Sequence, residues 1–253
     1  MSTPKIALVT GGSRGLGKNM ALALAKQGID VILTYRSQKA EAESVVAEIT
    51  ALGRKALALE LDMANLASLD GFLQRVRENL QRVWGVSTFD FLINNAGVGA
   101  TIPIAAATEQ DFDTLLNIHF KGVYFLTQKS LLMMNDGGRV INVSSGTTRF
   151  AIPGYSMYAS MKSAVETFTR YLAKEIGQRG MAANIVAPGA IETDFNGAAV
   201  RNNPQMKAFL ASQTALGRVG EADDIGGVVA FLCTEGARWI NGQRIEVSGG
   251  INL

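Results

Sequence analysis

The chain has 253 residues, of which 47% are hydrophobic and 18% charged, and this balance excludes a largely disordered protein. Its formal net charge of +2 is too small and scattered for a nucleic-acid-binding surface, and no apolar stretch reaches the ~20 residues of a membrane span. The single cysteine, Cys233, excludes an internal disulfide and a cysteine-based metal site, and we expect it to be buried. Residues 1–5 lack the pattern of a signal peptide, so a cytoplasmic protein of one domain is expected, without membrane or nucleic-acid partners.

Apolar runs and helical patterns alternate along the chain. Strands are predicted at residues 6–10, 31–35, 56–61, 89–93, 139–143, 184–187 and 244–247. Helices are predicted at residues 18–27, 41–52, 66–80, 108–134, 156–178 and 222–232, with a short helix at 204–212 in the otherwise irregular stretch 190–220. Thr108 and Asp111 form a capping-box pattern at the start of the fourth helix. The alternation predicts an α/β fold, with a doubly wound parallel sheet and helices on both faces.

Polar and glycine-rich segments follow several of the predicted strands. They are the turn from Gly11 to Gly17, Asp62, the segment 94–97, the pair Ser144-Ser145, and Pro188-Gly189. Parallel sheets bind their ligands at the carboxyl ends of the strands. These segments are therefore expected to meet in one binding site.

The first turn carries glycines at positions 11, 15 and 17, between a strand and a helix. Glycines let the backbone approach a pyrophosphate closely, and the helix N-terminus supplies N–H groups and a positive dipole. The spacing differs from the common G-x-G-x-x-G pattern. A nucleotide site is the preferred interpretation, and a plain strand–helix turn is the alternative.

Tyr158 and Lys162 lie four residues apart in a predicted helix, so both side chains share one face. A free phenol titrates near pH ~10, and a nearby cation is expected to lower that pKa. Such a tyrosine can serve as a general acid or base near neutral pH. A Tyr-x-x-x-Lys pair alone also occurs by chance in amphipathic helices.

Five motifs occur together in a fixed order: Thr10-Gly11-x-x-x-Gly15-x-Gly17, Asn94-Asn95-Ala96-Gly97, Ser145, Tyr158-x-x-x-Lys162 and Pro188-Gly189. This set resembles the short-chain dehydrogenase/reductase family, including its 3-oxoacyl-[acyl-carrier-protein] reductase-like members, over nearly the whole chain. The resemblance implies a Rossmann-type domain over residues 1–253, about seven parallel strands, a nicotinamide cofactor and usually a tetramer.

The end of the second strand, Thr34-Tyr35-Arg36-Ser37, lacks the carboxylate that NAD-type sites offer to the ribose. Arg36, and Arg14 in the glycine turn, could instead hold a 2′-phosphate, so NADP(H) is predicted in preference to NAD(H). The alternative is that both arginines are solvated surface charges. With the resemblance, the predicted cofactor-binding residues are Gly11, Ser13, Arg14, Gly15, Leu16, Gly17, Arg36, Ser37, Asp62, Met63, Asn95, Ala96, Gly97, Tyr158, Lys162, Pro188, Gly189, Ile191 and Thr193.

The resemblance also implies the catalytic roles. Ser145 would hold the substrate oxygen, Tyr158 would exchange the proton, and Lys162 would bind the nicotinamide ribose and lower the pKa of the tyrosine. Hydride transfer to a carbonyl creates negative charge on oxygen, which two hydroxyl donors would stabilise. Ser145 is preferred to Ser144 by its spacing from Tyr158, and strand alternation would turn the two serines to opposite sides.

One position departs from the family pattern. Where an asparagine is usual, shortly before Gly122-Val123-Tyr124-Phe125, this chain has His119, its only histidine. Three interpretations remain open: His119 replaces the asparagine in function, it is a packed helix histidine, or a local shift of the helix brings Asn117 to the position.

The loop at residues 100–107 and the segment 190–213 should form the substrate wall. Its apolar members are Ile102, Ile104, Phe150, Ile152, Tyr155, Phe195 and Phe209. A small apolar ketone or aldehyde is therefore the preferred substrate. One alternative is reduction of a 3-oxoacyl group on acyl carrier protein, although residues 133–136 offer no basic side chain and only Lys174 and Arg179 supply charge. A second is an NADP(H)-binding redox sensor without catalysis.

A homo-oligomer, a tetramer or dimer, is expected mainly from the resemblance. The predicted helices at 108–134 and 156–178 are long enough to pair with copies of themselves. The helix from residue 222 and the last strand, with Trp239 nearby, could form a second contact.

Overall fold

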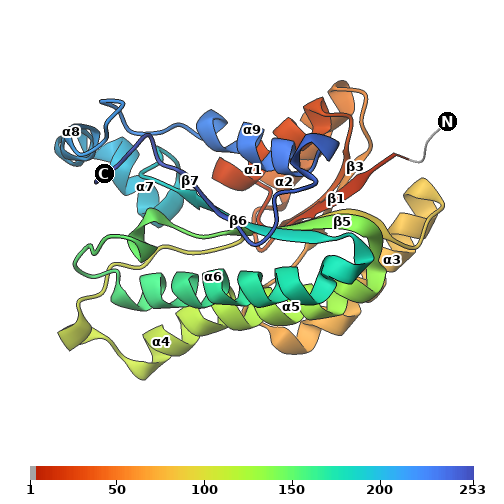
Figure 1. The fold of residues 1–253 in the computed structure, drawn as a ribbon, viewed down its shortest axis with the longest axis horizontal. Helices are drawn as coiled ribbons and strands as arrows, with labels where there is room; N and C mark the ends of the chain where they lie inside the picture. Colours follow the sequence, from red (N-terminus) through yellow and green to blue (C-terminus); the bar gives the residue numbers. More distant parts are fainter. Residues whose placement is uncertain (1–3) are drawn as a thin grey trace.

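The computed structural model describes residues 4–253 and contains a seven-stranded parallel sheet over that range. Its order is β3-β2-β1-β4-β5-β6-β7 (Figure 1). The strands are β1 (Ile6–Val9), β2 (Asp30–Tyr35), β3 (Ala56–Glu60), β4 (Phe89–Asn94), β5 (Met134–Val143), β6 (Ala182–Pro188) and β7 (Arg244–Val247). The prediction of a doubly wound α/β sheet is confirmed.

Helices cover both faces of this sheet. On one face lie α1 (Gly15–Lys26), α2 (Lys39–Ala51) and α9 (Asp223–Leu232), and on the other lie α3 (Leu69–Trp84), α4 (Glu109–Leu116), α5 (Gly122–Ser130) and α6 (Ser156–Ile176) (Figure 1). Alternate strand residues divide between the two layers: Ile6 and Leu8 pack towards α3 and α6, and Ala7 and Val9 towards α1 and α9. Strands buried on both faces read as continuous apolar runs, which is why the sequence showed them clearly.

The strand order places the site. β1 pairs with β2 on one side and with β4 on the other. The strands up to β3 are therefore added on one side of β1, and the strands from β4 onwards on the other side. Crevices outside the carboxyl ends of strands at such a switch point are where doubly wound sheets bind ligands. The glycine turn after β1 and the segment 94–97 after β4 therefore lie side by side.

The predicted helix at 108–134 is not a single α-helix. Its capping box at Thr108 and Asp111 is confirmed, but α4 ends at Leu116 and a π-helical turn, Asn117–Lys121, joins it to α5. A 3-10 turn, Leu131–Met133, then leads directly into β5, which begins at Met134, five residues before the predicted strand at 139–143. Side-chain periodicity cannot reveal one π turn, because it shifts the helical register by only one residue.

The segment after β6 also differs from the prediction. The short helix α8 (Pro204–Ser212) is confirmed, but it is preceded by an unpredicted helix, α7 (Phe195–Asn202). The helix α7 begins with non-helical backbone: Asn196, Gly197 and Ala198 all have positive φ angles. Such a start has no signal in hydrophobic periodicity, which is why the segment read as irregular.

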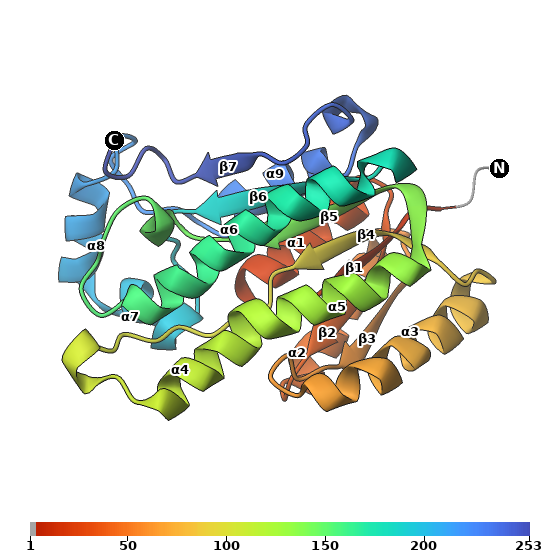
Figure 2. The same cartoon turned by 60° about the horizontal axis from the view of Figure 1, so that its bottom comes forward.

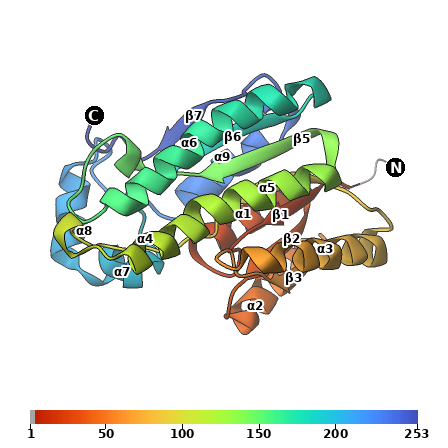
Figure 3. The same ribbon diagram turned by 90° about the horizontal axis from the view of Figure 1, so that it is seen from below.

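Two helices present apolar side chains to solvent. Figures 2 and 3 show α5 and α6 running side by side across the face opposite α1 and α9. Tyr124, Phe125, Leu132 and Tyr171 are exposed on or just beyond these helices, and Trp239, before β7, is 95% exposed. Within residues 4–253, no helix is both long and apolar enough to cross a bilayer.

Candidate active site

The side chains of Tyr158 and Lys162 lie on the buried face of α6, one helical turn apart. Tyr158 is 8% exposed and Lys162 is 4% exposed. Lys162 Nζ donates a hydrogen bond of 2.8 Å to the carbonyl oxygen of Val143, the last residue of β5. The same nitrogen lies 5.7 Å from the centre of the Tyr158 ring. The helix thus brings both groups to the carboxyl end of the sheet.

Burial controls the ionisation of this pair. It raises the pKa of the Tyr158 hydroxyl above its usual range, while a hydrogen bond with Ser145 acts in the opposite direction. Burial also lowers the pKa of Lys162 to about 8. The expectation that Lys162 lowers the pKa of Tyr158 is therefore wrong for this structure. The ammonium faces the ring and the Val143 carbonyl, and desolvation of the phenolate outweighs its field.

The two serines after β5 have separate partners. Ser144 is buried, and its hydroxyl donates to Glu166 at 2.6 Å. The Ser145 hydroxyl lies near that of Tyr158, where it opposes the rise in the phenol's pKa, and its Oγ accepts from the N–H of Thr147 at 3.2 Å and from the Thr147 hydroxyl at 3.0 Å. Only Ser145 is therefore in position beside the tyrosine.

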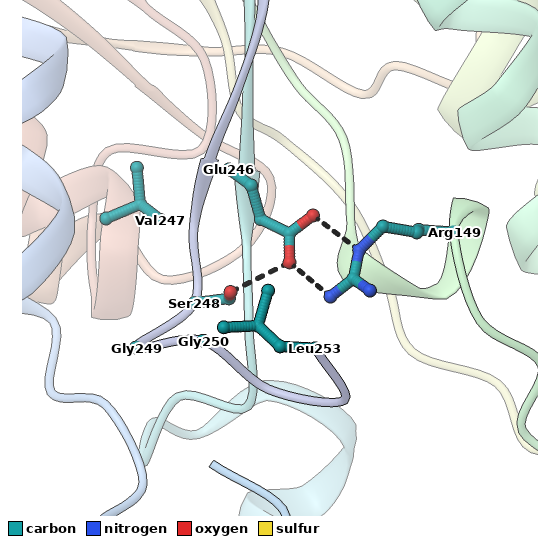
Figure 4. A pocket seen from close by; sticks show the side chains of 7 residues that line it. All are labelled: Arg149, Glu246, Val247, Ser248, Gly249, Gly250 and Leu253. Carbon is teal, nitrogen blue, oxygen red and sulfur yellow. Dashed lines mark hydrogen bonds and ion pairs between the residues drawn. The ribbon is translucent and has the colours of Figure 1, made fainter. Parts of the chain in front are cut away.

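A network of charged side chains supports the loop at residues 144–149, here called the Ser145 loop. The sequence analysis did not predict this network. Arg244, on β7, donates to Glu166 at 2.9 Å and to the Ser145 carbonyl at 3.2 Å. Its third partner is Glu246, at 2.8 Å. Figure 4 shows Glu246 between Arg149 and Ser248, both of which donate to its carboxylate. The network ties the Ser145 loop to α6, β7 and the C-terminal segment.

His119, in the π-helical turn, is fully buried and lies against the tyrosine. Its ring centre is 5.1 Å from that of Tyr158, in an edge-to-face arrangement. Nε2 lies 2.9 Å from the carbonyl oxygen of Val98, so we assign the ring proton to Nε2. Nδ1 has no hydrogen-bond partner among residues 4–253. Burial and the nearby Lys162 lower the pKa of His119 to about 3, so the imidazole is neutral.

The imidazole, and not Asn117, therefore occupies the position beside Tyr158. Asn117 is only partly buried and lies at the start of the π turn. His119 also limits its neighbour, because a Cβ added to Gly97 would lie 2.8 Å from the imidazole Cε1. The sequence motif Asn95-Ala96-Gly97 and the histidine are thus matched in shape.

The glycine turn packs tightly against the end of β4. The Thr10 hydroxyl accepts hydrogen bonds from the N–H groups of Asn95 and Ala96, both at 3.0 Å. A Cβ on Gly17 would lie 2.0 Å from the Gly11 carbonyl oxygen and 2.5 Å from Asn95 Nδ2. Gly11 has φ = 65°, a conformation that other residues rarely adopt. The close packing explains why glycine stands at both positions.

The structure brings together most of the other predicted cofactor residues. A Cβ on Gly15 would lie 3.7 Å from Thr193, so the segment after β6 reaches the glycine turn. Met63 is buried against Gly122, and Ile191 forms a bridge to Gly220. Of the remaining predicted residues, Arg14, Arg36, Ser37 and Asp62 are exposed, Ser13, Leu16 and Gly189 are partly buried, and Pro188 is buried at the end of β6.

The substrate wall is only partly as predicted. Phe195 and Tyr155 lie near the tyrosine, with ring centres 6.1 Å and 6.2 Å from that of Tyr158. Ile104 and Phe209 are instead 78% and 63% exposed, so they do not line a closed wall. Asn196 was not predicted as a member of this wall. Its side chain donates hydrogen bonds to Thr101, in the loop at residues 100–107, and to Tyr155. No spacing in the sequence links these three residues.

Comparison with known proteins agrees with this geometry. The family model of enoyl-(acyl carrier protein) reductase matches residues 11–252. The hydroxynaphthalene reductase-like protein Arp2 of Metarhizium brunneum is 34% identical over 257 residues, covering 97% of this chain and 94% of that protein. The promiscuous reductase LugOII, which catalyses keto-reduction at C1 during lugdunomycin biosynthesis, is 37% identical, with a TM-score of 0.94 over 99% of both chains. A short-chain dehydrogenase from Burkholderia cenocepacia, solved with NADP, is 37% identical, with a TM-score of 0.89 over 98% of both chains.

The charged network predicts how stability depends on pH. Hydrogen bonds from Arg149 and Arg244 hold the pKa of Glu246 at about 2, below its ordinary value of 4.5. A depressed carboxyl pKa stabilises the fold above about pH 4.5, and this contribution is lost as the pH falls towards 2. Glu246→Gln should therefore lower the free energy of unfolding by roughly 2 kcal/mol at pH 7 and flatten its decline between pH 5 and pH 3. Urea unfolding at several pH values measures both effects.

The matched control is Glu43→Gln, which removes an exposed carboxylate on α2 whose only ion pair in the described structure is with Lys39, four residues away. Exposed pairs of this kind contribute little. Equal acid profiles for Glu246→Gln and the wild-type protein would contradict the assigned role of Glu246.

Proposed function

The chain belongs to the short-chain dehydrogenase/reductase family of oxidoreductases, and on that premise we propose that it is an NADP(H)-dependent ketoreductase. The observation that carries the proposal is the buried Tyr158 hydroxyl, with the Ser145 hydroxyl near it and Lys162 facing its ring, at the same end of the sheet as the glycine turn. Its substrate would be a ketone or aldehyde, or the corresponding alcohol, bound against the apolar side chains near Phe195 and Tyr155. The reductase names of the compared proteins support this class.

The residues present fit a dinucleotide. The glycine turn opens α1, whose first N–H groups point out of the helix, and no acidic side chain stands in its first turn. A phosphate group is stabilised at such a helix N-terminus. The close packing of Gly11 and Gly17 keeps side chains out of the turn. When bound, the nicotinamide supplies or accepts the hydride.

The chain's own residues would handle the proton and the charge. Ser145 and Tyr158 would donate hydrogen bonds to the carbonyl oxygen, where negative charge develops during reduction. Tyr158 would then transfer its proton to that oxygen, and Lys162 would stabilise the phenolate that remains. Lys162 is held for this task by the Val143 carbonyl. A role in binding the nicotinamide ribose is proposed for it as well.

The preference for NADP(H) is proposed from charge. Arg36 follows β2 and Arg14 lies in the glycine turn, and both side chains are exposed at the rim of the site. Guanidinium groups bind phosphate through charge-assisted, often bidentate hydrogen bonds. The NADP bound to the related Burkholderia cenocepacia protein supports this choice.

A second candidate function is reduction of a 3-oxoacyl group on acyl carrier protein. The matching family model is described as an enoyl-(acyl carrier protein) reductase, which supports a carrier-bound substrate but concerns a different bond. The basic surface on which an acidic carrier protein would dock is smaller than the sequence suggested. Arg179 is engaged within the chain, where it pairs with Asp136 at 2.7 Å and donates to the carbonyls of Leu131 and Met134. We therefore favour a free ketone. A homo-oligomer in the cytoplasm remains the expected form, and the exposed apolar side chains on α5 and α6 support self-association.

The central test is NADPH oxidation with a panel of ketones and an acyl-carrier thioester. The wild-type protein should reduce at least one free ketone faster than the thioester. Tyr158→Phe should lower kcat by about 10²- to 10⁴-fold, because the general acid is lost while the ring and its packing remain. Tyr171→Phe, at an exposed position on the same helix, is the matched control. NADPH binding without turnover of any carbonyl would overturn the proposal and favour the redox sensor.

Cofactor choice is tested with Arg36→Ala and Arg14→Ala. Each should raise KM for NADPH by about 10- to 100-fold and leave KM for NADH nearly unchanged, since charged hydrogen bonds contribute about 1.5–3 kcal/mol. Arg77→Ala, at an exposed position on α3, should change neither value. Parallel losses for NADH and NADPH would show that the arginines do not recognise the 2′-phosphate.

His119 is proposed as a positioning residue that fixes the Tyr158 ring. Because its pKa is about 3, it stays neutral throughout the working range, and kcat should show no ionisation that disappears on substitution. His119→Asn, which keeps a hydrogen-bonding side chain, should retain turnover within about tenfold, the scale of one neutral hydrogen bond. Steady-state kinetics between pH 6 and pH 9 measure both. Full loss of activity in His119→Asn would instead mean that the imidazole takes part in the chemistry.

A further inference from the structure

Three polar side chains meet beside the candidate proton donor. They are Thr101, from the loop after β4, Tyr155, from the turn before α6, and Asn196, from the start of α7. We propose that this cluster, the polar clamp, binds a second oxygen of the substrate. The protein would then prefer ketones that carry a hydroxyl or carbonyl group near the reacting carbonyl. The inference rests on the proposed ketoreductase function and names its substrate class.

The clamp is held together by one amide. Asn196 Nδ2 donates to Thr101 Oγ1 and to the Tyr155 hydroxyl, both at 3.2 Å. Both distances lie at the long end of the normal range, so these are weak hydrogen bonds. A substrate oxygen could replace either of them at small cost. The clamp therefore offers donors and acceptors that a ligand can reach.

The clamp stands where a substrate would lie. The Tyr155 ring centre is 6.2 Å from that of Tyr158, and Phe195, the neighbour of Asn196, is 6.1 Å from it. A ketone bound at Tyr158 would therefore lie close to the clamp.

The surrounding chain is shaped to hold Asn196 there. A Cβ on Gly99 would lie 2.6 Å from the Asn196 Cβ, so only glycine leaves room for this side chain. Asn196 and Ala198 both have left-handed backbone, with φ angles of 53° and 59°. Asparagine tolerates that conformation better than most residues, whereas alanine does not.

The chemistry of the clamp defines the ligand. Its neighbours along the chain, Ile102 and Phe195, are apolar and would accept any hydrocarbon ring. An amide and two hydroxyl groups in such a wall favour a ligand that also carries oxygen, because a site with polar groups rejects an analogue that leaves them unpaired. A hydroxylated cyclic or aromatic ketone matches both parts of the wall.

The test compares two kinds of substrate, with NADPH as the reductant. One is 1-tetralone, and the other is the set of isomeric monohydroxy-1-tetralones. The measured quantity is the ratio of kcat/KM for the best hydroxylated isomer to that for 1-tetralone, in the wild-type protein and in variants. Comparing this ratio between proteins cancels the intrinsic reactivity of the ketones. Tyr155→Phe keeps the ring and removes the hydroxyl. Asn196→Gly removes the amide and accepts the left-handed backbone, so the fold is preserved.

In both variants the ratio should fall by about tenfold, the effect of one neutral hydrogen bond, while KM for NADPH stays within about threefold. Tyr171→Phe is the control for the tyrosine change and should leave the ratio unaltered. An unchanged ratio in both variants, with 1-tetralone still reduced, would overturn the clamp and leave the ketoreductase function standing. Failure of the wild-type protein to reduce any ketone would overturn both.

Discussion

The hydrogen bond from Lys162 Nζ to the Val143 carbonyl is the contact on which the candidate site depends. A buried ammonium is costly unless it is hydrogen-bonded, and Lys162 is 4% exposed. The last carbonyl of β5 meets that need, and α6 is thereby fixed over the end of the sheet. Tyr158, one turn earlier on the helix, and Ser145, two residues beyond the strand, must then converge. The segments that carry Ser145 and Tyr158 are ordinary when each is considered alone. They form a site because the buried Lys162 ammonium requires a hydrogen-bond partner at the end of β5.

The features that the sequence revealed are those governed by local chemistry or by continuous burial. The strands stood out because they are apolar on both faces, and the capping box at Thr108 because its two side chains are three residues apart. The glycine turn stood out because Gly11 and Gly17 leave room that no other residue could leave. In each case the signal lies within a few consecutive residues, even where, as at Gly11, the contact that requires it is with the end of β4.

The missed features depend on contacts between distant parts of the chain. Glu166 and Arg244 pair across 78 residues, and Asn196 reaches Thr101 across 95. Neither pair has a spacing that distinguishes it from surface charge or loop polarity. The π turn at Asn117–Lys121 is local, but it changes the direction of the side chains in one helical turn only. Hydrophobic periodicity is judged over several turns, so it does not reveal such a change. It nevertheless decides that His119, not Asn117, packs on Tyr158.

The electrostatics of the buried pair bear on the direction of the reaction. Burial raises the pKa of Tyr158 and lowers that of Lys162 to about 8, so near pH 7 the phenol is protonated and most of the ammonium remains charged. A protonated phenol is ready to donate, as reduction of a carbonyl requires, whereas alcohol oxidation first needs a phenolate as the base. Forming that phenolate becomes easier as the pH rises, but above about pH 8 the same change neutralises the lysine that would stabilise it. The protonation state of the pair near pH 7 is thus the one from which Tyr158 can donate a proton and Lys162 can face the charge that remains.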